Sequence, residues 1–158
     1  ALLYTMIKDY KGALKYFNWF DKEFPDDVGF PDFNLYKASA YFENNLHEKV
    51  KPAIYKTIFS NIYLLDLMVD KNPTEKEFVG NSNIDKIEYA KYVVDACVEH
   101  ISDKFMNQVK LFTESDEYKK NLKEFISIEK LISDERPGEM RSKLIDERRK
   151  FEDKLTKL

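Results

Sequence analysis

Few residues in this chain combine a reactive type with a spacing that suits chemistry, and the best placed are a cysteine, a histidine and an aspartate. Cys97, His100 and Asp103 follow one another at intervals of three residues, so a helix would bring them near one face. Thiolate, imidazole and carboxylate groups are ligands for a divalent metal, but three ligands do not complete a structural site. The other interpretation is a buried thiol in an apolar stripe with a histidine at the surface edge, and we favour that structural role.

No other pattern predicts a catalytic centre. The sequence has no glycine-rich phosphate loop, no paired-histidine zinc motif and no serine nucleophile elbow. Its 29 Asp and Glu residues are numerous enough to form pairs on a helical surface by chance. We therefore expect a protein without catalytic activity, cofactor or metal. An enzyme with its site in the carboxyl-terminal half is kept as an alternative.

Composition sets the expected class of fold and excludes several kinds of partner. The chain of 158 residues is 43% apolar and 15% aromatic, and it contains only 4 Gly and 5 Pro, which leaves few residues for the turns of a β-sheet. A net charge of -3 disfavours nucleic-acid binding. No apolar run approaches the roughly 20 residues of a membrane span. We expect an all-α, cytoplasmic protein with neither a nucleic-acid nor a membrane partner.

Apolar periodicity predicts where the helices lie. Asn44-Asn45 and Pro137-Gly138 are expected to end helices, and Pro52 is expected to lie in or near the first turn of one. Residues 74–83 interrupt every periodicity and predict a linker. The expected helical segments are 1–7, 9–24, 32–43, 48–68, one or two helices over 84–112, then 116–132 and 139–158.

One run of residues shows the pattern of a helical repeat. Tyr10, Ala13, Phe17, Phe20 and Pro25 are separated by 3, 4, 3 and 5 positions. This pattern resembles the second helix of a tetratricopeptide repeat. In that motif the small residue allows two antiparallel helices to approach closely, the aromatic residues pack around it, and the proline ends the unit.

A second, degenerate unit of the same kind is readable further along, with Ala38 and Tyr41 in its first helix. The resemblance covers residues 1–73, with the first repeat truncated at its amino end. Short segments such as Phe24-Pro25-Asp26-Asp27 are also similar to segments of uncharacterised bacterial repeat proteins. It implies antiparallel helix pairs stacked into a superhelix. Residues 74–83 would link this solenoid to carboxyl-terminal helices over 84–158 that pack on it or cap it.

The resemblance also nominates residues for a partner surface. The first helix of each unit lines the concave face in this family, which places Thr5, Ser39 and Phe42 there. Trp19 lies off the packing stripe, so it either packs between units or contacts a ligand. The lysines and asparagines with which some relatives clamp acidic chaperone tails are replaced here by Leu2, Leu35 and Ser39, so that clamp is not expected.

The last predicted helix, 139–158, has two possible interpretations. It either caps the solenoid with its apolar stripe or pairs with a second copy of the chain, because Leu144, Phe151, Leu155 and Leu158 are spaced as in a short coiled coil. A homodimer through 139–158 is therefore an open alternative. Our leading hypothesis is a non-catalytic adaptor or scaffold that binds a peptide or partner helix in a helical groove.

Overall fold

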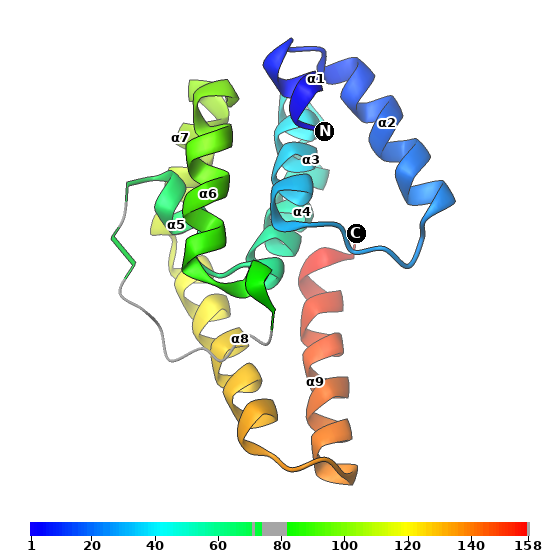
Figure 1. The fold of residues 1–158 in the computed structure, drawn as a ribbon, viewed down its shortest axis with the longest axis vertical. Coiled ribbons are helices and arrows are strands. Elements are labelled where there is room, and N and C mark those ends of the chain that lie inside the picture. Colours follow the sequence, from blue (N-terminus) through cyan, green and yellow to red (C-terminus); the bar gives the residue numbers. More distant parts are fainter. Residues whose placement is uncertain (71, 74–81, 158) are drawn as a thin grey trace.

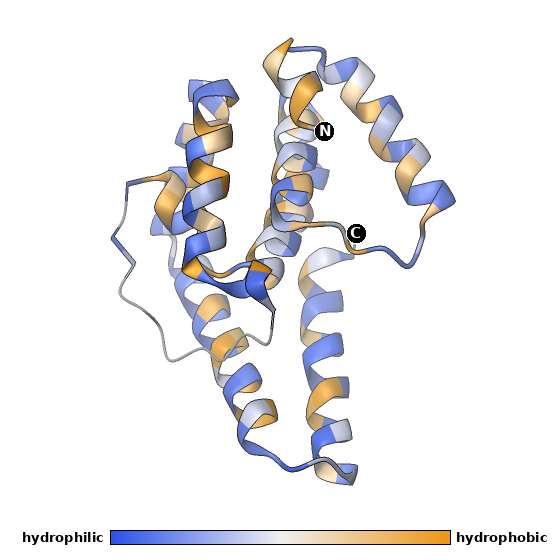
Figure 2. Ribbon diagram, in the orientation of Figure 1, coloured by the Kyte–Doolittle hydropathy of each residue, from blue (hydrophilic) through white to orange (hydrophobic). Residues whose placement is uncertain are grey.

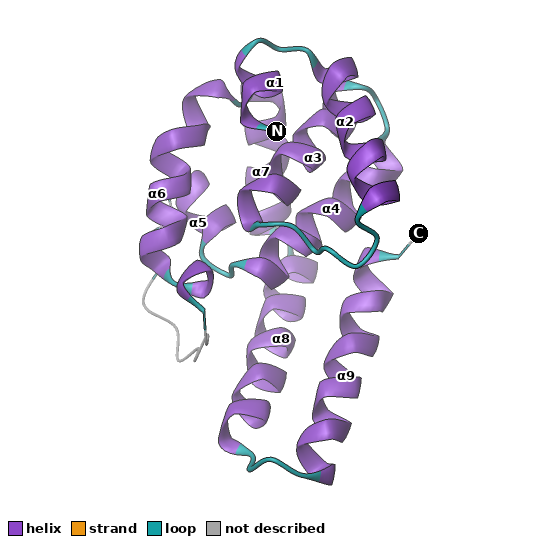
Figure 3. Ribbon diagram, turned by 45° about the vertical axis from the view of Figure 1, so that its right-hand side comes forward, coloured by secondary structure: helices purple, strands orange, loops and turns teal. Residues whose placement is uncertain are grey.

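The computed structural model describes residues 1–70, 72–73 and 82–157, and within these ranges all regular structure is helical (Figure 3). This confirms the predicted all-α class. No helix of the described chain is both long and apolar enough to cross a membrane. The helices in chain order are α1 (Leu2–Met6), α2 (Tyr10–Glu23), α3 (Pro31–Glu43), α4 (His47–Ser60), α5 (Leu64–Met68), α6 (Ile87–Cys97), α7 (Asp103–Glu114), α8 (Asp116–Asp134) and α9 (Glu139–Thr156), with short 3-10 turns at Asn83–Asp85 and Val98–His100.

Local sequence signals explain most of these boundaries. The Asp9 carboxylate caps α2 by accepting the Gly12 N–H at 2.9 Å, and Ser102 and Ser115 cap α7 and α8 in the same way. Pro31 begins α3, where its missing N–H is not needed. Asn45 adopts a φ of 58° after α3, which confirms the expected left-handed stop.

Helix α3 is the centre of the molecule. It packs against α1, α2, α4 and α7, and most of its residues are buried on every side. One hydrophobic cluster extends from Phe17 on α2 through α3 and α4 to Phe105 on α7, Phe125 on α8 and Phe151 on α9. The two halves of the sequence therefore share a core.

The fourth helix is shorter than predicted. The expected segment 48–68 is divided at Asn61, whose buried side chain accepts the N–H groups of Tyr63 and Leu64 at 2.9 and 3.1 Å and so starts α5. Its amide nitrogen also donates to the carbonyls of Ile84 and Lys86, at 2.7 and 3.0 Å. An apolar periodicity cannot reveal this break, because the partners that stabilise it come from another part of the chain.

Two smaller expectations are also refined. Pro52 lies inside α4, beyond its first turn, so the backbone carbonyl four residues earlier receives no helical hydrogen bond from it. The segment predicted as one or two helices over 84–112 contains two, α6 and α7, divided where Ser102 caps the second. Most of the predicted linker, 74–81, lies outside the described residues, and Asn83 begins a short 3-10 turn.

Helices α8 and α9 form a long antiparallel hairpin that extends away from the other helices (Figures 1 and 3). Helix α9 then returns to pack on α4 as well as on α8. Its polar residues dominate its surface (Figure 2), and Phe151 is its one buried residue within the described part of the helix. Because α4 and α9 are distant in sequence, the array is not a stack in which each unit touches only its neighbours.

Candidate functional site

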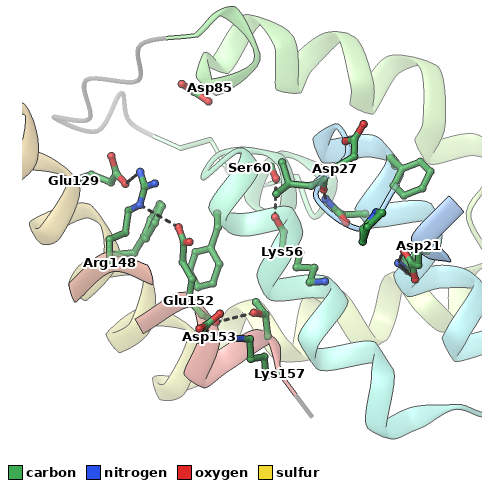
Figure 4. Close-up of a pocket in the computed structure, with 18 residues that line it drawn as sticks. Asp21, Asp27, Lys56, Ser60, Asp85, Glu129, Arg148, Glu152, Asp153 and Lys157 are labelled. Carbon is green, nitrogen blue, oxygen red and sulfur yellow. Dashed lines mark hydrogen bonds and ion pairs between the residues drawn. The ribbon is translucent and has the colours of Figure 1, made fainter. Parts of the chain in front are cut away.

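A cleft of ≈ 590 Å³ lies where the α2–α3 connection, α3, α4, α8 and α9 meet (Figure 4). Apolar side chains of Phe33, Phe59 and Phe125 line part of it, and charged side chains line much of the rest. Phe59 on α4 holds the two sides of the hairpin together, because its ring contacts Phe125 of α8 and Phe151 of α9 at centroid distances of 4.8 and 6.0 Å. The cleft thus exists because α9 folds back beside α4.

On one side of the cleft, Lys37 of α3 is buried and paired with Asp21 of α2. The Lys37 Nζ donates to both Asp21 carboxylate oxygens, at 2.5 and 2.7 Å, and the lysine side chain is only 8% exposed. Burial lowers the pKa of Lys37 below its ordinary value, and the hydrogen bond and charge of Asp21 oppose that shift. The pair links α2 to α3 and leaves little of the lysine charge for a ligand.

On the opposite side of the cleft, one arginine forms ion pairs with two carboxylates. Arg148 of α9 donates to Glu129 of α8 at 2.9 Å, and its Nε lies 3.5 Å from Glu152. Burial raises the pKa of the Glu152 carboxyl, Arg148 opposes that shift, and Glu129 adds to it. Two carboxylates around one guanidinium leave an excess of negative charge on this wall.

Where Val28 of the α2–α3 connection lines the cleft, this connection and the last part of α2 expose large apolar side chains. Trp19 is 50% exposed, Phe24 48%, Val28 80% and Phe30 60%; we call these four residues the apolar rim. Val28 also lines the cleft. The Trp19 ring contacts Tyr16 and Phe24, at centroid distances of 5.9 and 5.8 Å. These contacts leave half of the indole open to a ligand.

Local geometry fixes the shape of this connection. Gly29 has a φ of 70°, a conformation that glycine adopts readily, and its N–H donates to the Asp27 carboxylate at 2.8 Å. The Asn34 side chain of α3 donates to the Val28 carbonyl at 2.9 Å. The Asp27 bond thus fixes the turn within the connection, the Asn34 bond ties it to α3, and the Val28 side chain remains exposed.

The residues expected to pack the repeat occupy different environments. Ala13, Phe17, Ala38 and Tyr41 are buried, and Tyr10 and Phe20 are half-buried. Pro25 is exposed and lines the cleft. The structure therefore brings most of this set into the core.

The residues nominated for partner binding separate into two groups. Thr5 and Ser39 are buried, so neither offers a contact surface in this fold. Phe42 is half-buried and its ring contacts His47 and Phe105. Trp19 alone of the four belongs to the apolar rim.

Cys97, His100 and Asp103 do not form a metal site. Within the ranges that the structure covers, no three His, Cys, Asp or Glu side chains are grouped so as to hold a metal ion. The Cys97 thiol is buried against the Tyr36 hydroxyl, and burial raises its pKa. Asp103 instead begins α7, beyond the turn that contains His100.

Sequence reasoning missed the charged side chains of the cleft and three of the four rim residues. The ion pairs join residues 16 and 19 positions apart in sequence, on different helices, so no local pattern predicts them. A signal for the rim was present: large apolar residues alternate with acids and prolines in a segment that breaks helices. No protein-family model matches the chain, and neither curated proteins nor solved structures give a significant match.

Proposed function

We propose that the protein is a non-catalytic binding module that holds a segment of another protein across the cleft and the apolar rim. Its scaffold over residues 1–73 would be of the tetratricopeptide type. Two successive helix pairs in this region, with Ala13 and Ala38 buried, support that relationship. The departure from a simple stack comes from α9, which adds the second wall of the cleft.

The apolar rim is the observation that carries the proposal. Exposed apolar side chains clustered at the edge of a concave site are typical of surfaces that bind partners. Aromatic residues such as Trp19 and Phe24 contribute strongly to such interfaces, because they bury a large area at a small cost in conformational entropy. The rim is pre-organised by ring contacts and by the Asp27 and Asn34 hydrogen bonds, which lowers the cost of binding.

The cleft beside the rim has the size and shape for part of a polypeptide. Its volume of ≈ 590 Å³ lies within the range of roughly 300 to 1,000 Å³ that ligand sites occupy. Its walls are helices, and a groove between helices accepts either a partner helix or an extended segment. Apolar anchors would reach Phe33 and Phe59, while polar groups would meet the charged walls.

Site-specific photo-crosslinking tests the proposal. A photoreactive amino acid placed at position 28 or 30 of the full chain should capture the same protein from extracts of the cells that produce it. The matched control is position 111 on α7, because Leu111 is also exposed but lies outside the rim and the cleft. Excess Val28→Ser/Phe30→Ser protein without a photoreactive group should compete poorly, and the same excess of wild-type protein should compete well.

Two outcomes would contradict the proposal. One is capture of the same set of proteins from positions 28 and 111, which would mean non-specific adhesion. The other is no protein captured at position 28 or 30 while the protein remains folded by circular dichroism.

A further inference from the structure

We propose that the segment bound by the cleft and the apolar rim is a cationic amphipathic peptide, with lysines or arginines interspersed among large apolar residues. This inference rests on the proposed function and specifies the chemistry of its partner. Three features support it: the charge of the α2–α3 connection, the pairing of the cations in the cleft, and the alternation of acids with apolar residues along the rim.

The α2–α3 connection, which carries three of the four rim residues, is acidic. Its residues 24–30 include Asp26 and Asp27 and no lysine or arginine, whereas Asp21 of α2 is paired with Lys37 and Asp32 of α3 accepts the Tyr89 hydroxyl. Asp26 is exposed beside Phe24 and Val28 in a shallow surface hollow. A partner of opposite charge would be steered toward this end of the molecule and held in register there.

The cations of the cleft offset this charge only in part. Lys37 is paired with Asp21, Arg148 with two glutamates, and Lys157 with Asp153 at 2.6 Å. Lys56 is the cleft cation for which the described part of the chain provides no ion pair. Asp27 and Asp85 line the same cleft (Figure 4) without a cationic partner in the described structure. The site therefore has an excess of carboxylates on both walls.

Apolar and acidic positions alternate along the connection. Phe24, Val28 and Phe30 are exposed, and Asp26 and Asp27 lie between the first two in sequence. A complementary partner must place apolar side chains on the rim and cations within a few ångströms of them. An amphipathic helix with a basic polar face meets both requirements, and an acidic or neutral peptide meets only the first.

Selection from a random-peptide display library against the immobilised full chain tests the partner class. We expect the enriched peptides to combine net positive charge with aromatic or aliphatic anchors. Their affinity can be measured on synthetic, tryptophan-free copies, because Trp19 is the single tryptophan of the chain and lies in the rim, where a bound peptide would change its fluorescence. Affinity should fall as salt is raised, since exposed charges are screened.

Charge and apolar variants separate the two contributions. Asp26→Asn/Asp27→Asn should weaken binding of the selected cationic peptide about tenfold, and the amide introduced at position 27 can still accept the Gly29 N–H. Asp95→Asn on α6 removes an exposed acid far from the site and should change affinity less than about twofold. Val28→Ser/Phe30→Ser should also weaken binding about tenfold, whereas Leu111→Ser should not.

The inference would be overturned if the enriched peptides are neutral or acidic, or if the aspartate variant binds them as tightly as the wild type does. It would also be overturned if the chain dimerises in sedimentation experiments and Val28→Ser/Phe30→Ser dissolves the dimer, since the rim would then be an interface between copies. A partner crosslinked at position 28 that binds through a neutral or acidic segment would leave the proposed function intact while refuting its cationic partner. No capture at positions 28 and 30 would refute both.

Discussion

The two walls of the cleft are built in opposite ways. Helix α3, on one side, is buried around most of its circumference and packs against four other helices. Helix α9, on the other side, buries only Phe151 in its described length and is otherwise held by ion pairs and by half-buried side chains that include Leu144 and Leu155. Burial of apolar surface is the main source of stability, so the free energy of folding is concentrated on the α3 side.

This difference also bears on the dimer hypothesis for residues 139–158. Phe151 and Leu155, two of the side chains proposed for a coiled coil, pack against the core of their own chain. Leu144 is half-buried, and Leu158 lies outside the described residues. The same apolar stripe cannot serve both contacts at once, so pairing with a second copy would require α9 to leave α4.

The largest expected effect comes from truncating the α3 wall. Leu35 is fully buried at the centre of the fold, and Leu35→Ala should lower the free energy of unfolding by about 2 to 5 kcal/mol. Leu144→Ala on α9 is the matched control and should cost much less, because Leu144 is half-buried. Urea denaturation measures both. Equal losses would show that the two walls are equally well packed.

An intermediate effect is expected at the single buried residue of α9. Phe151→Ala removes the ring that contacts Phe59 and should destabilise α9 by about 3 kcal/mol. Because few other apolar contacts hold this helix, we expect it to detach locally. Hydrogen exchange should then accelerate in α9 and remain slow in α3. Uniform acceleration through both helices would mean that α9 unfolds only with the whole molecule.

The smallest effects concern two glutamates of the α8–α9 hairpin whose pKa values shift in opposite directions. The hydrogen bond and the charge of Lys51 lower the pKa of Glu117, and the hydrogen bond from the Tyr55 hydroxyl lowers it further. Burial instead raises the pKa of Glu152. Glu117 therefore contributes stability above the ordinary carboxyl pKa that is lost as pH falls through its lowered value. Glu152 behaves in the opposite sense: its ionisation costs stability as pH rises through its raised value.

Substitution by glutamine should reveal these opposite signs. At neutral pH, Glu117→Gln should destabilise the protein and Glu152→Gln should stabilise it, each by no more than about 1 kcal/mol because both side chains are partly exposed. Both differences should vanish in acid, where the carboxyls of folded and unfolded chains are protonated. Thermal melts across the acidic to neutral range would measure them. Two shifts of the same sign would contradict the assigned environments.

Much of this molecule is determined by local sequence. The spacing of Tyr10, Ala13, Phe17 and Phe20 sets an amphipathic helix, Asp9 caps it, and Asn45 follows the end of α3. Pro137-Gly138 is expected to end a helix, but α8 already ends at Asp134 and Gly138 is the N-cap of α9. The low glycine and proline content disfavours a β-sheet and favours long helices. These features depend on interactions between residues a few positions apart, which a single sequence contains directly.

The candidate site was decided by tertiary structure. Asn61 ends α4 because the carbonyls of Ile84 and Lys86 reach it, and the cleft forms because Phe151 of α9 returns to Phe59 of α4. Ser39 is buried rather than presented to a partner because helices surround α3. Each outcome depends on which helix faces pack together. Apolar periodicity indicates that a helix face will be buried, but it does not indicate which other helix will cover that face.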